Sequence, residues 1–117
     1  NDDQPYMVHT RSGKPMVSVS YTSEVNDFSF LRQGLGAESG LEMFKEQFDW
    51  LYEESATTGR FMNIGLHPHV IGQPYRVRAI RDFIRYAKTF DDVWFATREE
   101  IAEWYLENQG DHIPASS

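Results

Sequence analysis

Two histidines separated by one proline form the segment of this sequence whose residue types could most readily do chemistry. His67-Pro68-His69 follows an apolar run, Phe61 to Leu66, that we expect to form a buried strand. Proline lacks the N–H that a strand ladder needs, so the strand should stop at His67 and leave both imidazoles in a loop. An imidazole there can act as a general acid or base, bind a metal ion, or serve as a structural hydrogen-bonding group. The pattern leaves these three roles open.

A second polar segment, 22–30, follows the first convincing strand, 16–21, and holds Glu24, Asn26 and Asp27. In α/β folds the side chains at the carboxyl ends of parallel strands face the ligand crevice. We therefore predict that these three residues contribute to the same site as the histidines. Asn26 and Asp27 are also common turn formers, so a purely local role stays open for them.

The elements that would position both segments alternate along the chain. We predict a strand at 16–21, a helix opened by a Ser39/Glu42 capping box, a strand at 61–66, a helix at 74–88, a strand at 93–96, and a helix opened by a Thr97/Glu100 capping box. Such alternation, in units of about thirty residues, is typical of an α/β fold with a parallel sheet and right-handed crossovers. Three parallel strands are few for an independent domain.

Composition limits both size and partners. The 117 residues allow one domain, yet 8 Phe, 6 Tyr and 3 Trp are more aromatic surface than three strand-helix units hide. We expect a self-association face or additional protein to cover the excess. The net charge of −7 argues against nonspecific nucleic-acid binding and against an anionic membrane surface. No apolar run approaches the roughly 20 residues of a membrane span, and the absence of cysteine fits a cytoplasmic location.

Several ordered blocks of the sequence are similar to one protein family. They are Asp3-Gln4-Pro5-Tyr6, Gly13-Lys14-Pro15, Tyr21-Thr22-Ser23-Glu24-Val25-Asn26-Asp27, Asn63-Ile64-Gly65-Leu66-His67-Pro68-His69 and Val93-Trp94-Phe95-Ala96-Thr97-Arg98. Together they resemble the carboxyl-terminal half of polysaccharide deacetylases, in the branch that contains cofactor-independent allantoinases and peptidoglycan deacetylase-like proteins. The resemblance covers about Asp2 to Leu106. It implies a domain at 1–110, followed by a disordered tail at 111–117.

The resemblance implies a partial (β/α) barrel and roles for particular residues. His67 occupies the position of the histidine that protonates the leaving nitrogen, and the loop from Tyr21 to Asp27 should shape the substrate pocket. His69 is expected to line the same substrate pocket, at a position that is often arginine in the family. Relatives hold a zinc-like divalent metal with an aspartate and two histidines of their amino-terminal half. These motifs are absent from the 117 residues, so we expect no metal in this chain alone.

Three functional hypotheses follow. The first is part of a metal-dependent hydrolase that cleaves a non-peptide C–N bond in an acetamido sugar or in a cyclic amide such as allantoin. That enzyme would be inactive without a companion amino-terminal half. The second is a non-catalytic truncated half-barrel that forms a homo-oligomer. The third is a metal site at His67 and His69, of the kind that amidohydrolases use.

Overall fold

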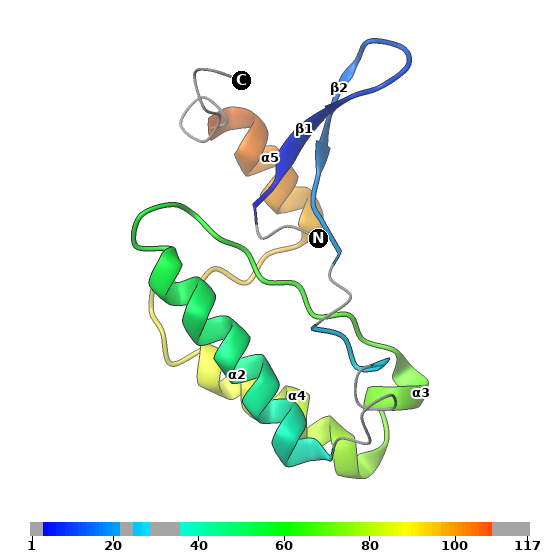
Figure 1. The fold of residues 1–117 in the computed structure, drawn as a ribbon, viewed down its shortest axis with the longest axis vertical. Coiled ribbons are helices and arrows are strands. Elements are labelled where there is room, and N and C mark those ends of the chain that lie inside the picture. The colour runs from blue at the N-terminus through cyan, green and yellow to red at the C-terminus, as the bar shows by residue number, and fades with distance from the viewer. Residues whose placement is uncertain (1–3, 22–24, 29–35, 109–117) are drawn as a thin grey trace.

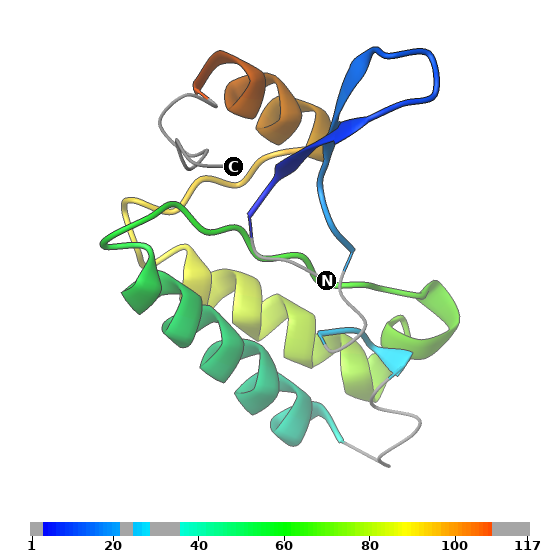
Figure 2. The same ribbon diagram turned by 45° about the horizontal axis from the view of Figure 1, so that its top comes forward.

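The computed structural model of the protein describes residues 4–21, 25–28 and 36–108. Its elements are β1 (Tyr6–His9), β2 (Pro15–Ser18), α2 (Ala37–Glu54), α3 (Pro68–Ile71), α4 (Pro74–Ala87) and α5 (Arg98–Asn108) (Figure 1). The helices α2 and α4 form one layer, and two extended segments, 59–66 and 91–96, cross it (Figure 2). The β1–β2 hairpin and α5 lie beyond these segments. The described part of the chain is thus mixed α/β.

The only sheet among the described residues is the antiparallel pair of β1 and β2, in which His9 lies opposite Pro15. The turn between them uses Gly13 at a φ of +79°, and the Gly13 N–H donates to the Thr10 carbonyl over 2.9 Å. The parallel pairing predicted for the strand at 16–21 is wrong, and β2 ends at Ser18. A partner only one tight turn away costs little loop-closure entropy, which favours this local pairing.

The core lies between α2 and α4, which run side by side in the same direction (Figures 1 and 2). Phe44 and Phe48 of α2 are buried against Phe83 of α4, with ring centroids 5.7 and 5.9 Å apart in edge-to-face geometry. Phe44 and Phe48 are four residues apart, so helical spacing puts both on the face of α2 that packs on α4. The helix predicted at 74–88 is confirmed within one residue.

The strands predicted at 61–66 and 93–96 run as extended chain, but the described residues form no ladder with them. Their one backbone pairing is a parallel bridge between Asn26 and Gly65. Met62, Ile64 and Val93 still pack on the helical core, so hydrophobic burial places both segments as expected. The two segments diverge toward α3 and α5 (Figure 2), whereas a ladder needs neighbours in register along its whole length. The predicted three-stranded parallel sheet is therefore absent from the described part of the chain.

The two predicted capping boxes have different outcomes. Thr97 and Glu100 form one: the Glu100 N–H donates to Thr97 Oγ1 and the Thr97 N–H to Glu100 Oε1, both over 3.1 Å. The box predicted at Ser39 is wrong, because α2 already begins at Ala37 with Gly36 as its N-cap. Ala37 is buried in the core cluster, which favours the additional helical residues.

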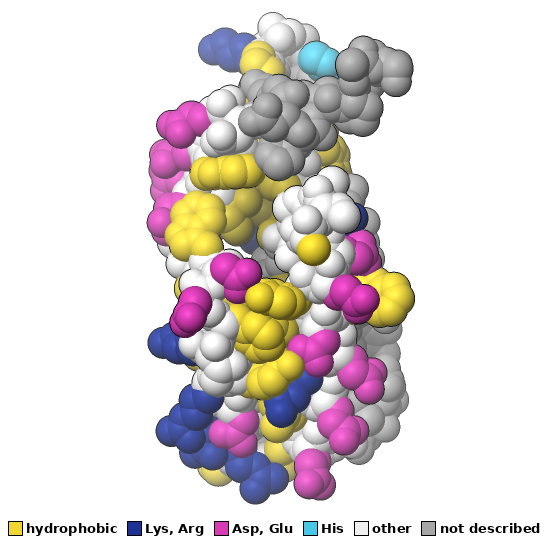
Figure 3. All heavy atoms as spheres, turned by 90° about the vertical axis from the view of Figure 1, so that its left-hand side faces the viewer, with side chains coloured by type: hydrophobic (Ala, Val, Ile, Leu, Met, Phe, Trp, Pro, Cys, Tyr) yellow, Lys and Arg dark blue, Asp and Glu magenta, His cyan; other side chains and the backbone are white. Residues whose placement is uncertain are grey.

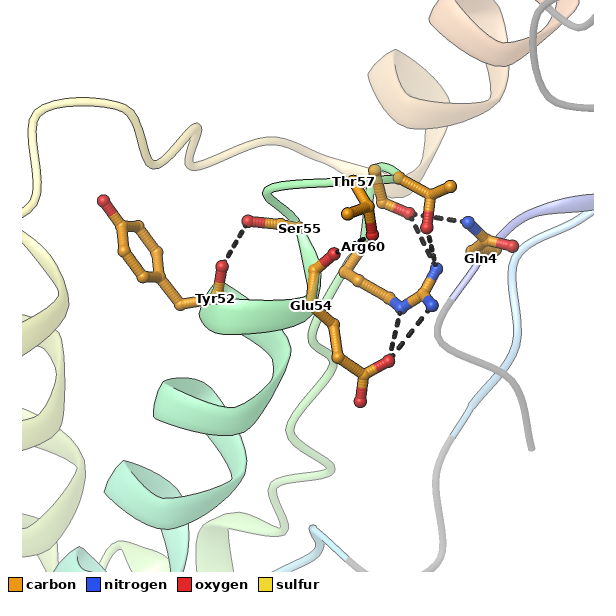
Figure 4. Close-up of polar contacts among 8 residues, drawn as sticks. Gln4, Tyr52, Glu54, Ser55, Thr57 and Arg60 are labelled. Carbon is orange, nitrogen blue, oxygen red and sulfur yellow. Dashed lines mark hydrogen bonds and ion pairs between the residues drawn. The ribbon is translucent and has the colours of Figure 1, made fainter.

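The end of α2 is tied to its surroundings by polar contacts (Figure 4). Arg60 places Nε and Nη2 at 3.1 and 3.0 Å from the same carboxylate oxygen of Glu54. Gln4 Nε2 donates to the Gly59 carbonyl over 2.8 Å. The segment before β1 is therefore fastened to the loop that leads into residues 61–66.

The surface of the helix layer is divided by charge. In the lower half of Figure 3, most acidic side chains lie on the right and most Lys and Arg on the left, with hydrophobic side chains between them; further acidic side chains lie at the upper left. No helix in residues 4–21, 25–28 or 36–108 is long and apolar enough to cross a membrane. The tail predicted to be disordered, 111–117, lies outside the described residues.

Candidate functional site

The parallel bridge brings the two polar segments together. The Asp27 N–H donates to the Gly65 carbonyl over 2.9 Å, and the Gly65 N–H donates to the Val25 carbonyl over 3.0 Å. Residues 25–28 therefore lie beside the end of the 61–66 segment, just before His67. The two segments run in the same direction at this bridge, although the described residues form no parallel ladder.

Asp27 and His67 form a paired acid and imidazole. Asp27 Oδ1 lies 2.7 Å from His67 Nδ1, and the His67 backbone N–H donates to Asp27 Oδ2. The Asp27 side chain is fully buried, whereas the His67 side chain is 31% exposed. An ionised carboxylate only accepts hydrogen bonds, so the pairing makes Nδ1 the donor. The other ring nitrogen, Nε2, is then available for chemistry.

An aromatic side chain borders this pair. The Phe28 ring centroid lies 4.1 Å from that of His67 and 5.8 Å from that of His69. The two imidazole centroids are 5.9 Å apart, with their planes at 74°. Phe28 thus contacts both imidazoles and supplies an apolar wall beside the paired one.

A metal site is not completed by these residues. The His67 Nδ1 is taken by Asp27, and two imidazoles alone make an incomplete ligand set. Within the described ranges, no group of three or more His, Asp or Glu side chains lies close enough together to hold a metal ion. The donor set therefore does not fit the metal-pair hypothesis, and we assign no step of chemistry to a metal held here.

The remaining residues predicted to bind substrate are placed differently from one another. Asn26 is buried, and its Nδ2 donates to the Tyr21 hydroxyl over 3.3 Å. Its Oδ1 accepts the Phe28 N–H over 3.0 Å, which closes the turn around Asp27. Tyr21 is exposed and lies at the edge of the site. Glu24 lies outside the described residues.

Three contributors were not anticipated from the sequence. Phe28 forms the apolar wall, and Gly65 leaves room for the amide of Asn26, since a Cβ there would lie 2.3 Å from Asn26 Nδ2. Arg98, at the start of α5, reaches the Tyr21 ring, with 5.2 Å between Cζ and the ring centroid. The glycine in the middle of an apolar strand pattern was the available signal, because it marks a close approach of another chain segment.

Comparisons with known proteins place this site in context. No model of a known protein family matches the chain. It is 33% identical over 114 residues to a Schizosaccharomyces pombe protein described as a polysaccharide deacetylase, covering 88% of this chain and 36% of that one. The structure is also similar to that of a protein from Pseudomonas aeruginosa PAO1 titled as a polysaccharide deacetylase. The TM-score is 0.83 at 43% identity, over 91% of this chain and 37% of that one.

A crystal structure titled Puue Allantoinase gives a TM-score of 0.84 at 39% identity, over 90% of this chain and 36% of that chain. The resemblance predicted from the sequence blocks is confirmed by these similarities. The chain spans little more than a third of the length of each of these three relatives.

Proposed function

We propose, from the premise that this chain is a homologue of the polysaccharide deacetylases and of an allantoinase, that it forms part of a hydrolase for a non-peptide C–N bond. One observation carries the proposal. His67 is held by a fully buried carboxylate at one ring nitrogen, while its side chain stays partly open to solvent. This is the arrangement expected of an imidazole that exchanges a proton with a substrate.

In the proposed reaction, water adds to the amide carbon, and the C–N bond of the resulting intermediate breaks. The leaving nitrogen must gain a proton as it departs. His67 Nε2–H donates that proton, and the ring returns to its neutral form. Asp27 fixes the ring orientation and stabilises the imidazolium beforehand. In this proposal Asp27 holds His67, in place of the substrate contact predicted for it from the sequence.

The surroundings of His67 support the same role. Phe28 covers one side of the imidazole and excludes water from part of the site. His69 is exposed and near enough to contact a substrate bound beside Phe28. Deacetylation of an acetamido sugar and opening of a cyclic amide both require a proton on the leaving nitrogen, so both substrate classes fit His67.

The divalent metal expected from the resemblance has no complete ligand set in the described part of this chain. We therefore place both the metal and the activation of water on a companion amino-terminal half. Without it, this chain alone is expected to be inactive. We also propose that the protein acts in the cytoplasm.

The test is a chimera in which this chain replaces the equivalent segment of the Puue allantoinase, assayed with allantoin and with N-acetylated sugar oligomers. We expect His67→Gln to lower kcat at least about a hundredfold, the usual scale of general acid–base catalysis. His9→Gln, at an exposed histidine of β1, is the matched control and should have no effect. Full activity of the His67 variant would show that the assignment is wrong.

A second candidate, a non-catalytic half-barrel that self-associates, is supported by the 91–96 segment. Trp94 and Phe95 are 57% and 52% exposed there, and adjacent exposed aromatic side chains are typical of an interface. Light scattering on the purified chain tests this candidate. A homo-oligomer that Trp94→Ser converts to a monomer would support it, and a strictly monomeric parent would contradict it.

A further inference from the structure

Arg98 occupies an unfavourable place in its helix. It is the first residue of α5, directly after the Thr97 cap. The partial positive charge of a helix N-terminus favours acidic side chains and disfavours a cation at the same place. The next two residues, Glu99 and Glu100, follow that preference. We therefore expect contacts of the Arg98 side chain outside the helix to offset this unfavourable charge interaction.

Those contacts lie on both sides of the Asn26–Gly65 bridge. With the Asn63 amide oxygen turned toward Arg98, it accepts from Nη2 at 2.7 Å and from Nε at 3.2 Å. The same guanidinium lies over the Tyr21 ring. Asn63 is two residues before Gly65 on one side of the bridge. On the other side, the Tyr21 hydroxyl accepts a hydrogen bond from the Asn26 side-chain amide.

We infer that Arg98 is a positioning residue that clamps the two segments carrying Asp27 and His67. The guanidinium fork fixes the 61–66 segment through Asn63. Its flat face fixes Tyr21 by a cation–π contact, and the Tyr21 hydroxyl in turn fixes Asn26. Asn26 closes the turn that points the Asp27 carboxylate at His67. Loss of the Arg98–Asn63 contact, or of the contacts from Arg98 through Tyr21 to Asn26, should therefore increase the distance between the Asp27 carboxylate and the His67 imidazole.

Gly65 makes this clamp effective. A Cβ at Gly65 would lie 2.3 Å from Asn26 Nδ2 and 2.4 Å from the Tyr21 hydroxyl. The polar groups that Arg98 contacts are thus packed directly against the backbone of Gly65, two residues before His67. A shift of Tyr21 or Asn26 is transmitted to the bridge without an intervening cavity.

The experiment measures the Asp27–His67 contact in the chain itself. In uniformly ¹⁵N-labelled protein, NMR should resolve a downfield His67 Nδ1–H signal, and hydrogen exchange should report the His67 backbone N–H together with the amides of the core. We expect Arg98→Met to remove the Nδ1–H signal and to accelerate exchange of the His67 amide about tenfold or more, a typical coupling for packed networks. Amides of the α2–α4 core, at Phe48 and Phe83, should exchange as in the parent.

Further variants distinguish the loss of each Arg98 contact from a general loss of stability. Arg85→Met removes an arginine that is 72% exposed on α4 and should leave the His67 signals unchanged. Arg98→Lys keeps a cation over Tyr21 but loses the fork, so an intermediate effect is expected. Tyr21→Phe keeps the ring and loses the bond to Asn26. Arg98→Lys and Tyr21→Phe are expected to leave the helical core intact, so these two variants report on the clamp even if Arg98→Met does not fold.

Unchanged His67 signals in folded Arg98→Met would overturn the inference. Unchanged signals in both Arg98→Lys and Tyr21→Phe would do the same, and so would an equal acceleration at His67 and at the core amides. The catalytic meaning of the clamp rests on the proposed function, but these readouts need no activity. Failure of the His67 assignment in the chimera would therefore leave the positioning role of Arg98 standing, and failure of the clamp would leave the acid role of His67 standing.

Discussion

Asp27 Oδ1 lies 2.7 Å from His67 Nδ1, although forty positions separate the two residues in the sequence. The same carboxylate accepts the His67 backbone N–H through its other oxygen. One buried side chain therefore satisfies both the imidazole and the backbone at the point where the extended segment enters α3.

Removing the carboxylate should destabilise the fold as well as the site. In Asp27→Ala, the His67 backbone N–H and Nδ1 lose their acceptor in a part-buried place, which we expect to lower the free energy of unfolding by about 1–3 kcal/mol. Urea denaturation followed by circular dichroism measures the change. Asp91→Ala, at an exposed carboxylate, should change it by no more than about 0.5 kcal/mol. Equal effects of the two substitutions would contradict the structural role of Asp27.

A methyl group at Gly65 should be poorly tolerated. It would lie within 2.3 to 2.9 Å of three atoms of Asn26 and Tyr21, so the bridge has to open or the side chains have to move. We expect Gly65→Ala to cost about 1–3 kcal/mol of the free energy of unfolding, the range for overpacking. Chemical denaturation measures this cost.

Gly36 provides the matched control for that experiment. It is the N-cap of α2, its backbone is extended, and no atom of the described residues lies within 4 Å of a Cβ placed there. Gly36→Ser should therefore change stability by only a few tenths of a kcal/mol, toward greater stability, because serine can cap the helix. A loss at Gly36 as large as that at Gly65 would show that close packing does not explain the effect.

The capping box of α5 should contribute measurably to stability. Thr97→Ala removes the Oγ1 that accepts the Glu100 N–H, and we expect a loss of about 1 kcal/mol in the free energy of unfolding. Thr97→Ser keeps the hydroxyl and should stay close to the parent. Thermal unfolding of the two variants in parallel gives the comparison. Equal losses for alanine and serine would mean that the methyl group, not the cap, matters at this position.

Tyr52 of α2 and Tyr86 of α4 should have pKa values above that of an ordinary tyrosine. A hydrogen bond to Asp92 raises the pKa of Tyr52 above its ordinary value of 10.0, with burial and the nearby charge adding to the effect. A hydrogen bond to Asp49 raises the pKa of Tyr86 in the same way. Because the folded pKa lies above the unfolded one, the stabilisation is fully present below about pH 10 and is lost as pH rises through the folded pKa.

Ultraviolet titration of tyrosinate measures these midpoints. Comparing the parent with Tyr52→Phe and Tyr86→Phe isolates each ring. Asp92→Asn should lower the midpoint of Tyr52, and Asp49→Asn that of Tyr86. Asp82→Asn, whose carboxylate pairs with Arg81 and Arg85 instead, should move neither. Titration midpoints of Tyr52 and Tyr86 that stay the same in the Asp92→Asn and Asp49→Asn variants would contradict the hydrogen-bond explanation.

Local features were predictable because local interactions determine them. The stripe with Phe44 and Phe48 follows from helical periodicity, the start of α5 from the Thr97/Glu100 pair, and the helix at 74–87 from its opening proline. The end of the apolar run at His67 follows from the proline after it. The blocks that resemble polysaccharide deacetylases also lie in the sequence itself, and the comparisons agree with them.

The pairing of strands was less predictable, because it depends on which segments meet. The sequence favoured a parallel partner for the strand at 16–21, but the chain turns at Gly13 and pairs it with β1. The extended segments 61–66 and 93–96 were located correctly from their apolar pattern. That pattern carries no information about ladder partners, and hydrophobic burial against α2 and α4 is satisfied without them.

The sequence by itself determined the places of α2, α4 and α5, the position of His67 at the end of an apolar run, and the family likeness. It did not predict α3, the short helix that contains His69 in place of the expected loop. Only the tertiary structure decided that Asp27 is a buried partner of that histidine and that Arg98 reaches both sides of the bridge beside it. Turn propensity describes Asp27 and Asn26 equally well as local residues. Their roles come from contacts between segments distant in the chain, which spacing and residue type do not encode.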